Sequence, residues 1–193
     1  MSKSSLRVIG AASALLLAGL TLTGCTINIG TGTDDKNTSQ SNPAAYSDAD
    51  VMFMQMMIPH HQQAVDMGTL AETRAVNAEV KDLAMQIKDE QRPEIVQMQG
   101  LLQDAGASET MGHHMTMDGM LSDSEYSALE KANGAEFDRL YLEGMIAHHE
   151  GAIQMAKNAI AGNKNSIVKD LCDRIISSQQ DQITYMKDLL TKL

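Results

Sequence analysis

The chain has 193 residues, a length that suits one domain with a core or at most two very small ones. Its 25 acidic and 15 basic side chains give a formal net charge of −10, which argues against a nucleic-acid-binding protein with a basic face. Two cysteines are too few for a disulfide scaffold or an all-thiolate zinc site. The unusual feature is 15 methionines beside six histidines that all occur as adjacent pairs.

Residues 1–24 have the layout of a lipoprotein signal peptide. Two basic residues precede the apolar stretch Val8–Leu22, which is shorter than the roughly 20 residues that span a bilayer. The following Leu22-Thr23-Gly24-Cys25 resembles a bacterial lipobox, in which the cysteine is lipidated. We therefore expect an exported protein anchored through Cys25 to the bacterial cell envelope, facing outside the cytoplasm. Residues 25–46, rich in Gly, Thr, Ser, Asn and Asp, are expected to form a flexible tether.

The remaining chain contains an internal repeat. A shift of 88 positions aligns Met57-Ile58-x-His60-His61-x-x-Ala64-x-x-Met67 with Met145-Ile146-x-His148-His149-x-x-Ala152-x-x-Met155, and the register continues to the end of the chain without a gap. Residues 47–193 are therefore expected to form one domain. Its repeat halves span about 47–106 and 135–193, and a Met/His-rich loop, 107–121, joins them.

Each half predicts a helical hairpin. Apolar spacing and capping residues place the first helix from the N-cap Ser47 to about Ala75 and the second over about Asn77–Asp104. In the other half, a capping box of Ser122 with Glu125 begins a helical segment that ends at Gly162, with a break near Gly134. The last helix covers about 166–193.

No strand pattern is present, so the expected fold is an all-α four-helix bundle of two packed hairpins. Pro59 and Pro93 lie within helical patterns and are expected to kink their helices.

Histidines and methionines share helix faces in both halves. His60 falls on one arc with Met56 and Met67, and His61 lies one turn after Met57. A pseudo-twofold bundle would bring the two histidine pairs near one centre with methionines around them. The expected ligands there are Met57, His60, His61, Met67, Met145, His148, His149 and Met155.

Imidazole nitrogen with thioether sulfur is a ligand set suited to copper, and Cu(I) in particular, with Ag(I) as its chemical relative. The alternative is structural: methionines that fill gaps in the core and histidines that are hydrogen-bonded within it. We favour the metal, because two vicinal histidine pairs recur in register.

A second cluster lies between the halves. Four methionines and two histidines occur within ten residues, punctuated by glycines, which no amphipathic helix stripe explains. This loop is expected to capture or pass on a labile ion through Met111, His113, His114, Met115, Met117 and Met120. The alternative is a surface linker with an accidental bias in composition.

The doubled Met-Ile-x-His-His-x-x-Ala-x-x-Met motif, with the stretch Gln91-x-x-Glu94-Ile95-x-x-Met98, resembles the exported bacterial family named domain of unknown function 305. The resemblance implies a ferritin-like helical bundle and, by analogy with a copper-binding member, periplasmic binding of Cu(I) or Ag(I) by the eight Met and His residues of the two motifs. The second half has Gln182 at the position equivalent to Glu94, so any role of the Glu94 carboxylate would be confined to the first half.

Other functions are less well supported. A ferritin-like metal oxidase would need Glu-x-x-His motifs, and no glutamate stands three residues before a histidine, so we do not expect an enzyme. Zinc binding would leave the methionines without a role. A metal-independent, membrane-tethered interaction protein stays as the competing class, and a homodimer or a copper-handling partner is left open. Cys172 is expected to be a buried, inert thiol, and Gln91 and Gln179 either orient histidines or are simply polar groups of the bundle.

Overall fold

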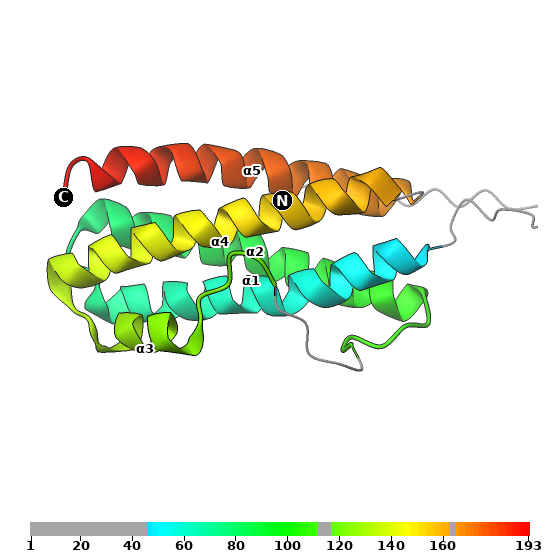
Figure 1. Ribbon diagram of the computed structural model, residues 1–193, viewed down its shortest axis with the longest axis horizontal. Coiled ribbons are helices and arrows are strands. Elements are labelled where there is room, and N and C mark those ends of the chain that lie inside the picture. The colour runs from blue at the N-terminus through cyan, green and yellow to red at the C-terminus, as the bar shows by residue number, and fades with distance from the viewer. Residues whose placement is uncertain (1–45, 112–116, 163–164) are drawn as a thin grey trace, which may run out of the picture. The chain divides into compact units, whose positions relative to one another are not determined.

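The computed structural model describes residues 46–111, 117–162 and 165–193, and this part of the chain contains five helices and no strand. The predicted signal peptide, nearly all of the tether and the centre of the Met/His loop lie outside the described residues. The prediction of an all-α fold is confirmed. The helices are α1 (Asp48–Arg74), α2 (Ala78–Asp104), the short α3 (Asp123–Lys131), α4 (Gly134–Gly162) and α5 (Ser166–Leu190) (Figure 1).

The helices begin where the capping residues predict. Ser47 accepts a hydrogen bond from the Asp50 amide while the Asp50 carboxylate accepts from the Ser47 amide, which closes a capping box at the start of α1. Ser122 and Glu125 form the same box at α3. Asn77 caps α2 and its repeat equivalent Asn165 caps α5, each through its side-chain oxygen.

The breaks also follow the sequence, with small differences. Gly106 after α2 and Gly134 at the start of α4 have φ values of 66° and 65°, which glycine adopts without a Cβ penalty. Helices α1 and α2 continue through Pro59 and Pro93. The last helix ends at Leu190, slightly before the predicted end.

Helix α1 packs against α2 and α4, and α4 packs against α5, so the two hairpins meet along α1 and α4 (Figure 1). Two apolar clusters fill the interior at different levels. One contains Met67 and Met145, and the other contains Met57 and Cys172. His60 and His61 lie between the two levels on α1, and His148 and His149 do so on α4. The histidines therefore form a polar layer between two apolar ones.

Within the described residues, no helix combines the length and the apolar character that crossing a membrane requires.

Candidate metal centre

The four bundle histidines are completely buried. His60, His61, His148 and His149 each have 0% of their surface exposed, whereas imidazoles in soluble proteins usually reach water. His60 of α1 and His148 of α4 lie against each other, with ring centroids 3.8 Å apart and planes inclined by 41°. His148 and His149 are 6.2 Å apart by the same measure. The structure thus brings one histidine of each repeat into direct contact.

The second histidine of each pair is oriented by the helix on its own side of the bundle. His61 Nε2 lies 2.8 Å from Glu94 Oε2 of α2. His149 Nε2 lies 2.7 Å from Gln182 Oε1 of α5, and Gln182 in turn donates to Glu90 Oε2 over 2.7 Å. The two contacts are equivalent under the repeat, but one acceptor is a carboxylate and the other a neutral amide.

These two orienting residues were not among the predicted site residues. For Gln91 and Gln179, orienting a histidine is one of two predicted roles. Both side chains are almost completely buried, but neither hydrogen-bonds a histidine among the described contacts. The residues that hold the imidazoles stand three positions further on, at Glu94 and Gln182.

The described end of the Met/His loop lies over His60. The His60 Nε2–H donates to the backbone carbonyl of Asp118 over 3.2 Å. Gln63, one turn later on α1, exchanges two hydrogen bonds with the backbone of Leu121, at 2.8 and 3.0 Å. These contacts attach the segment Met117–Leu121 to the histidine layer.

A glycine contact allows this close approach. A Cβ on Gly151 of α4 would overlap the Asp118 carbonyl oxygen and lie 2.5 Å from its carbon, and Gly119, with φ of 83°, faces Gly151 from the loop. Backbone therefore packs directly on backbone, and the Asp118 carbonyl reaches His60 only because position 151 carries no side chain.

We expect Gly151→Ala to destabilise the protein by about 2 kcal/mol, because the added methyl group pushes the segment Met117–Leu121 off α4. Chemical denaturation measures the change. Gly100→Ala is the control: it lies in exposed helix with nothing within 4 Å of the new Cβ, and it should stabilise by about 0.5 to 1 kcal/mol. Equal effects of the two substitutions would contradict the proposed contact.

Burial keeps three of these imidazoles neutral, those of His60, His148 and His149. Loss of solvent lowers the pKa of His60 to about 3, with a further contribution from His61, and it lowers the pKa of His149 to about 4. It also depresses the pKa of His148, which the neighbouring histidines lower further. A neutral imidazole is the form that binds a metal ion.

The hydrogen bonds determine which ring nitrogen keeps its lone pair. The Nε2–H groups of His60 and His149 donate to a carbonyl and an amide oxygen, so in these two neutral rings Nδ1 carries the lone pair. His61 is held through its Nε2 by the Glu94 carboxylate. The Nδ1 atoms of these three histidines and both nitrogens of His148 are buried without a hydrogen-bond partner in the described part of the chain. Metal-binding histidines typically have this arrangement, with one nitrogen fixed and the other free.

In residues 46–111, 117–162 and 165–193, no three His, Cys, Asp or Glu side chains come together in a group that could hold a metal ion. Imidazoles alone therefore do not complete a site in this arrangement. A metal at this centre would need a methionine sulfur among its ligands or a movement of the rings.

The methionines of the repeat divide between two environments. Met57, Met67 and Met145 are fully buried in the two apolar clusters. Met155 is only partly buried and packs at the edge of its cluster, although the repeat pairs it with Met67. Met67 and Met155 therefore occupy equivalent positions in the sequence repeat, but Met67 is buried in the core and Met155 is partly exposed.

Of the predicted loop ligands, Met111, Met117 and Met120 are described and half-buried. His113, His114 and Met115 lie outside the described residues, as does the predicted lipidation site Cys25. Cys172 is buried as expected, and burial raises the pKa of its thiol to about 12, so it stays protonated and inert.

Residues 50–190 match the family described as Domain of unknown function (DUF305). The chain belongs to the DUF305 family. It is 32% identical to a DUF305 protein of Streptomyces coelicolor that is described as secreted, with a TM-score of 0.70 over 75% of this chain and 91% of that one. It is 43% identical over 53 residues to an uncharacterized protein of Acanthamoeba polyphaga mimivirus, and this match spans 28% of the chain and 35% of that relative.

The DUF305 chain is also similar to CopM, whose structures include Cu(II)-, Cu(I)- and Ag-bound forms. Against the Cu(II)-bound form the identity is 35% and the TM-score 0.65, over 74% of this chain and 96% of CopM. These similarities confirm the resemblance inferred from the doubled histidine motif.

Proposed function

We propose that this protein binds Cu(I) or Ag(I) outside the cytoplasm, through imidazole nitrogen and methionine sulfur. The observation that carries the proposal is the layer of four buried histidines, three of them held through Nε2, whose Nδ1 atoms have no hydrogen-bond partner in the described part of the chain. Desolvating four imidazoles is costly unless their nitrogens find partners, and a metal ion supplies such partners. The similarity to CopM, with its copper- and silver-bound forms, supports the choice of ion.

The ligand set favours a soft monovalent ion. Thioether sulfur and neutral imidazole surround such an ion without adding negative charge to the interior, which suits Cu(I) and Ag(I). The proposed ligands in the bundle are drawn from His60, His61, His148, His149, Met57, Met67, Met145 and Met155. The loop methionines and histidines, Met111 to Met120, would capture the ion or pass it on.

Binding rather than catalysis is the proposed activity. The Glu94 carboxylate hydrogen-bonds His61, and at the equivalent repeat position the amide Gln182 hydrogen-bonds His149. A di-iron oxidase uses a carboxylate from each half to bridge its metals, and Gln182 does not provide the second one. We also propose that the fold is a ferritin-like four-helix bundle.

The proposed location is the cell envelope, with a lipid at Cys25 and the tether holding the domain away from the membrane. The signal-peptide layout supports export, and the similarity to a secreted DUF305 protein agrees with it.

A competition titration with a chromogenic Cu(I) chelator tests the function. We expect the purified protein to remove Cu(I) from the chelator, and His60→Ala/His148→Ala to weaken its binding at least about tenfold, since the pair of imidazoles in contact is lost. A variant with leucine in place of Met111, Met115, Met117 and Met120 and glutamine in place of His113 and His114 retains Asp118 and Gly119 at the histidine layer, and it should keep the bundle affinity. Circular dichroism and the denaturation midpoint check that each variant folds.

The outcomes separate the alternatives. If the intact protein does not compete for Cu(I), the proposed function is wrong and the metal-independent interaction protein is favoured. If only the variant with the loop methionines and histidines replaced loses binding, the bundle histidines are structural.

A further inference from the structure

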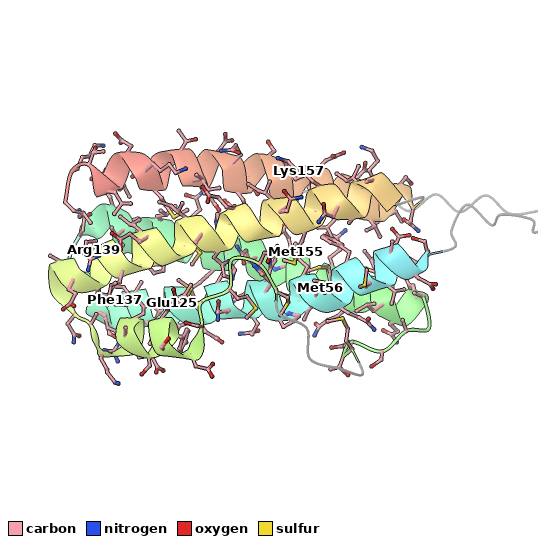
Figure 2. The ribbon with its side chains drawn as sticks, in the orientation of Figure 1. Met56, Glu125, Phe137, Arg139, Met155 and Lys157 are labelled. Atoms are coloured by element: carbon pink, nitrogen blue, oxygen red, sulfur yellow. The ribbon has the colours of Figure 1, made fainter. Side chains whose placement is uncertain are left out.

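A pocket between α1 and α4 is bordered by three methionines. Its volume is about 240 Å³, and Met52, Met56 and Met155 line it together with Ala49, Phe53, Asn158 and Ala159. Met52 is 47% exposed, and Met56 and Met155 are half-buried. Figure 2 labels Met56 on α1 and Met155 on the adjoining stretch of α4. Three thioethers thus border one solvent-accessible space, outside the buried histidine layer.

Helix geometry places these sulfurs together. Met52 and Met56 are one turn apart and share a face of α1, and Met155 reaches the same pocket from α4. Among the described residues, no carboxylate, imidazole or thiol lines the pocket, and the one polar side chain there is Asn158. Its side-chain oxygen accepts a hydrogen bond from Gln154 over 2.8 Å. The described lining therefore offers three neutral sulfurs and no charged oxygen, which favours a soft cation over a hard divalent one.

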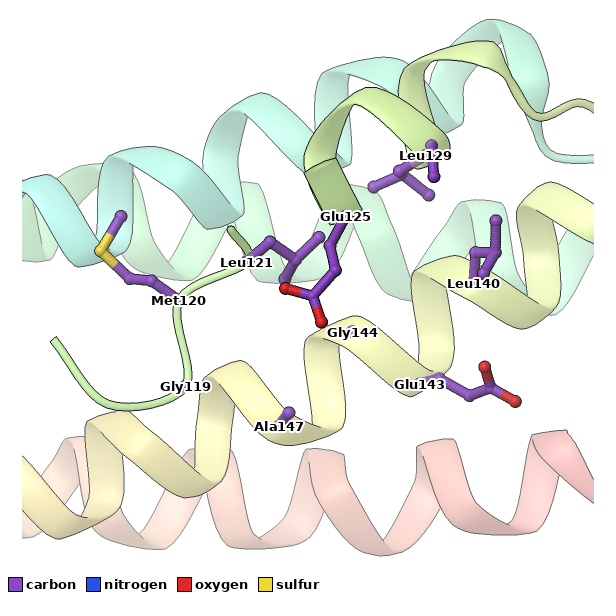
Figure 3. Close-up of a pocket in the computed structure, with 10 residues that line it drawn as sticks. Gly119, Met120, Leu121, Glu125, Leu129, Leu140, Glu143, Gly144 and Ala147 are labelled. Carbon is purple, nitrogen blue, oxygen red and sulfur yellow. The ribbon is translucent and has the colours of Figure 1, made fainter. Parts of the chain in front are cut away.

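The equivalent surface in the other repeat lacks this arrangement. The repeat counterparts of Met52 and Met56 are Leu140 and Gly144, which line a different pocket beside the loop and α3 (Figure 3). There the Leu121 side chain approaches within 3.3 Å of the Cβ position of Gly144, and Met67, the counterpart of Met155, is fully buried. In one repeat the segment Gly119–Leu121 and α3 thus cover this surface and Glu125 and Glu143 border its pocket, whereas in the other three methionines line the pocket.

We propose that Met52, Met56 and Met155 form an all-thioether site for a monovalent soft cation, Cu(I) or Ag(I), at the surface of the bundle. The identity of the ion rests on the proposed function. Met52 and Met56 are not among the ligands proposed there, and Met155, which is, is assigned here to the pocket because it is only partly buried at the edge of its cluster. Methionine has three rotatable side-chain bonds, so the three sulfurs can close on an ion much smaller than the pocket. Met52 is the most exposed of the three, at 47%, and would meet an arriving ion first.

Silver titration of the full protein, labelled with ¹³C at the methionine methyl groups, tests this site, because Ag(I) is a redox-inert probe for Cu(I). We expect the methyl signals of Met52, Met56 and Met155 to shift together and to saturate. In Met52→Leu/Met56→Leu/Met155→Leu, one equivalent of Ag(I) should be lost, or its dissociation constant should rise at least tenfold. Leucine keeps the volume and the apolar character.

Two comparisons make the result decisive. Met85→Leu removes a methionine of similar exposure, 44%, that lies on α2 away from the pocket, and it should leave the silver stoichiometry unchanged. His60→Ala/His148→Ala should leave the three methyl shifts in place.

The wild-type spectra alone can overturn the proposal, whether or not the triple variant folds. If histidine signals respond to Ag(I) while the three methyl signals stay fixed, this inference is wrong and the proposed function stands. If neither set responds, both are wrong. If the three methyl signals shift while the histidines do not, the surface site is supported and the histidine site is not.

Discussion

Acidification from pH 7.5 to pH 5 is expected to lower the free energy of unfolding of the metal-free protein by about 6 kcal/mol. Three buried imidazoles, those of His60, His148 and His149, have pKa values far below 6.5 because burial disfavours their charged forms. In the unfolded chain each regains an ordinary pKa near 6.5. At pH 5 each one therefore favours unfolding by about 2 kcal/mol, from 1.5 pH units at 1.36 kcal/mol each.

The stability falls on acidification because the unfolded state binds protons at a higher pH than the folded state. Above pH 6.5 both states are neutral at these positions and the histidines contribute nothing to pH dependence. As the pH falls, the unfolded chain takes up protons while the folded protein, with a pKa of about 3 for His60 and about 4 for His149, does not. Stability is therefore lost from about pH 6.5 down to about pH 4, where the folded imidazoles begin to titrate.

Urea denaturation at pH 7.5, 6.5, 5.5 and 5.0, in the presence of a metal chelator, measures this loss. Carboxylates titrate mainly below this window, so the slope reports the histidines. His149→Gln should reduce the slope by about a third whatever its effect on stability at pH 7.5. A free energy of unfolding that stays constant over this range would show that the imidazoles are not buried as described.

The repeat explains how much of the fold was predictable. Capping residues, glycines and helical spacing are local signals, and they placed the starts of α1, α2, α3 and α5 correctly. The burial of both histidine pairs also follows from their register within apolar helix faces. The orienting residues could have been found, because Glu94 and Gln182 stand 33 positions after His61 and His149, an interval that the repeat conserves.

What the sequence did not predict depends on contacts between distant segments. The segment Met117–Leu121 returns over His60 because Gly119 and Gly151 let two backbones touch, and no local pattern pairs those glycines. The linker breaks the symmetry of the repeat by covering one face of the bundle only. As a result Met67 is buried and Met155 borders an open pocket, although their sequence motifs are the same.

Asp138 is expected to be among the most sensitive positions outside the histidine layer. This α4 residue is 1% exposed, and its carboxylate accepts hydrogen bonds from the backbone amides of Val76 and Asn77, at 3.2 and 2.9 Å. It thereby joins the second hairpin to the turn between α1 and α2. Because Asn77 also caps α2, one carboxylate and one amide side chain together hold the start of that helix.

Asp138→Ala should lower the free energy of unfolding by about 3 kcal/mol, since two amide groups lose a charged acceptor in a partly buried turn. Asp138→Asn keeps one oxygen acceptor and should lie between the wild type and the alanine variant. Denaturation at pH 7.5 measures both, and Asp170→Ala, which removes an exposed carboxylate from α5, controls for the change in net charge. A loss no larger than that of Asp170→Ala would show that the carboxylate does not hold the turn. A large loss would show that this carboxylate, near the start of α4, helps to hold the second hairpin against the turn between α1 and α2.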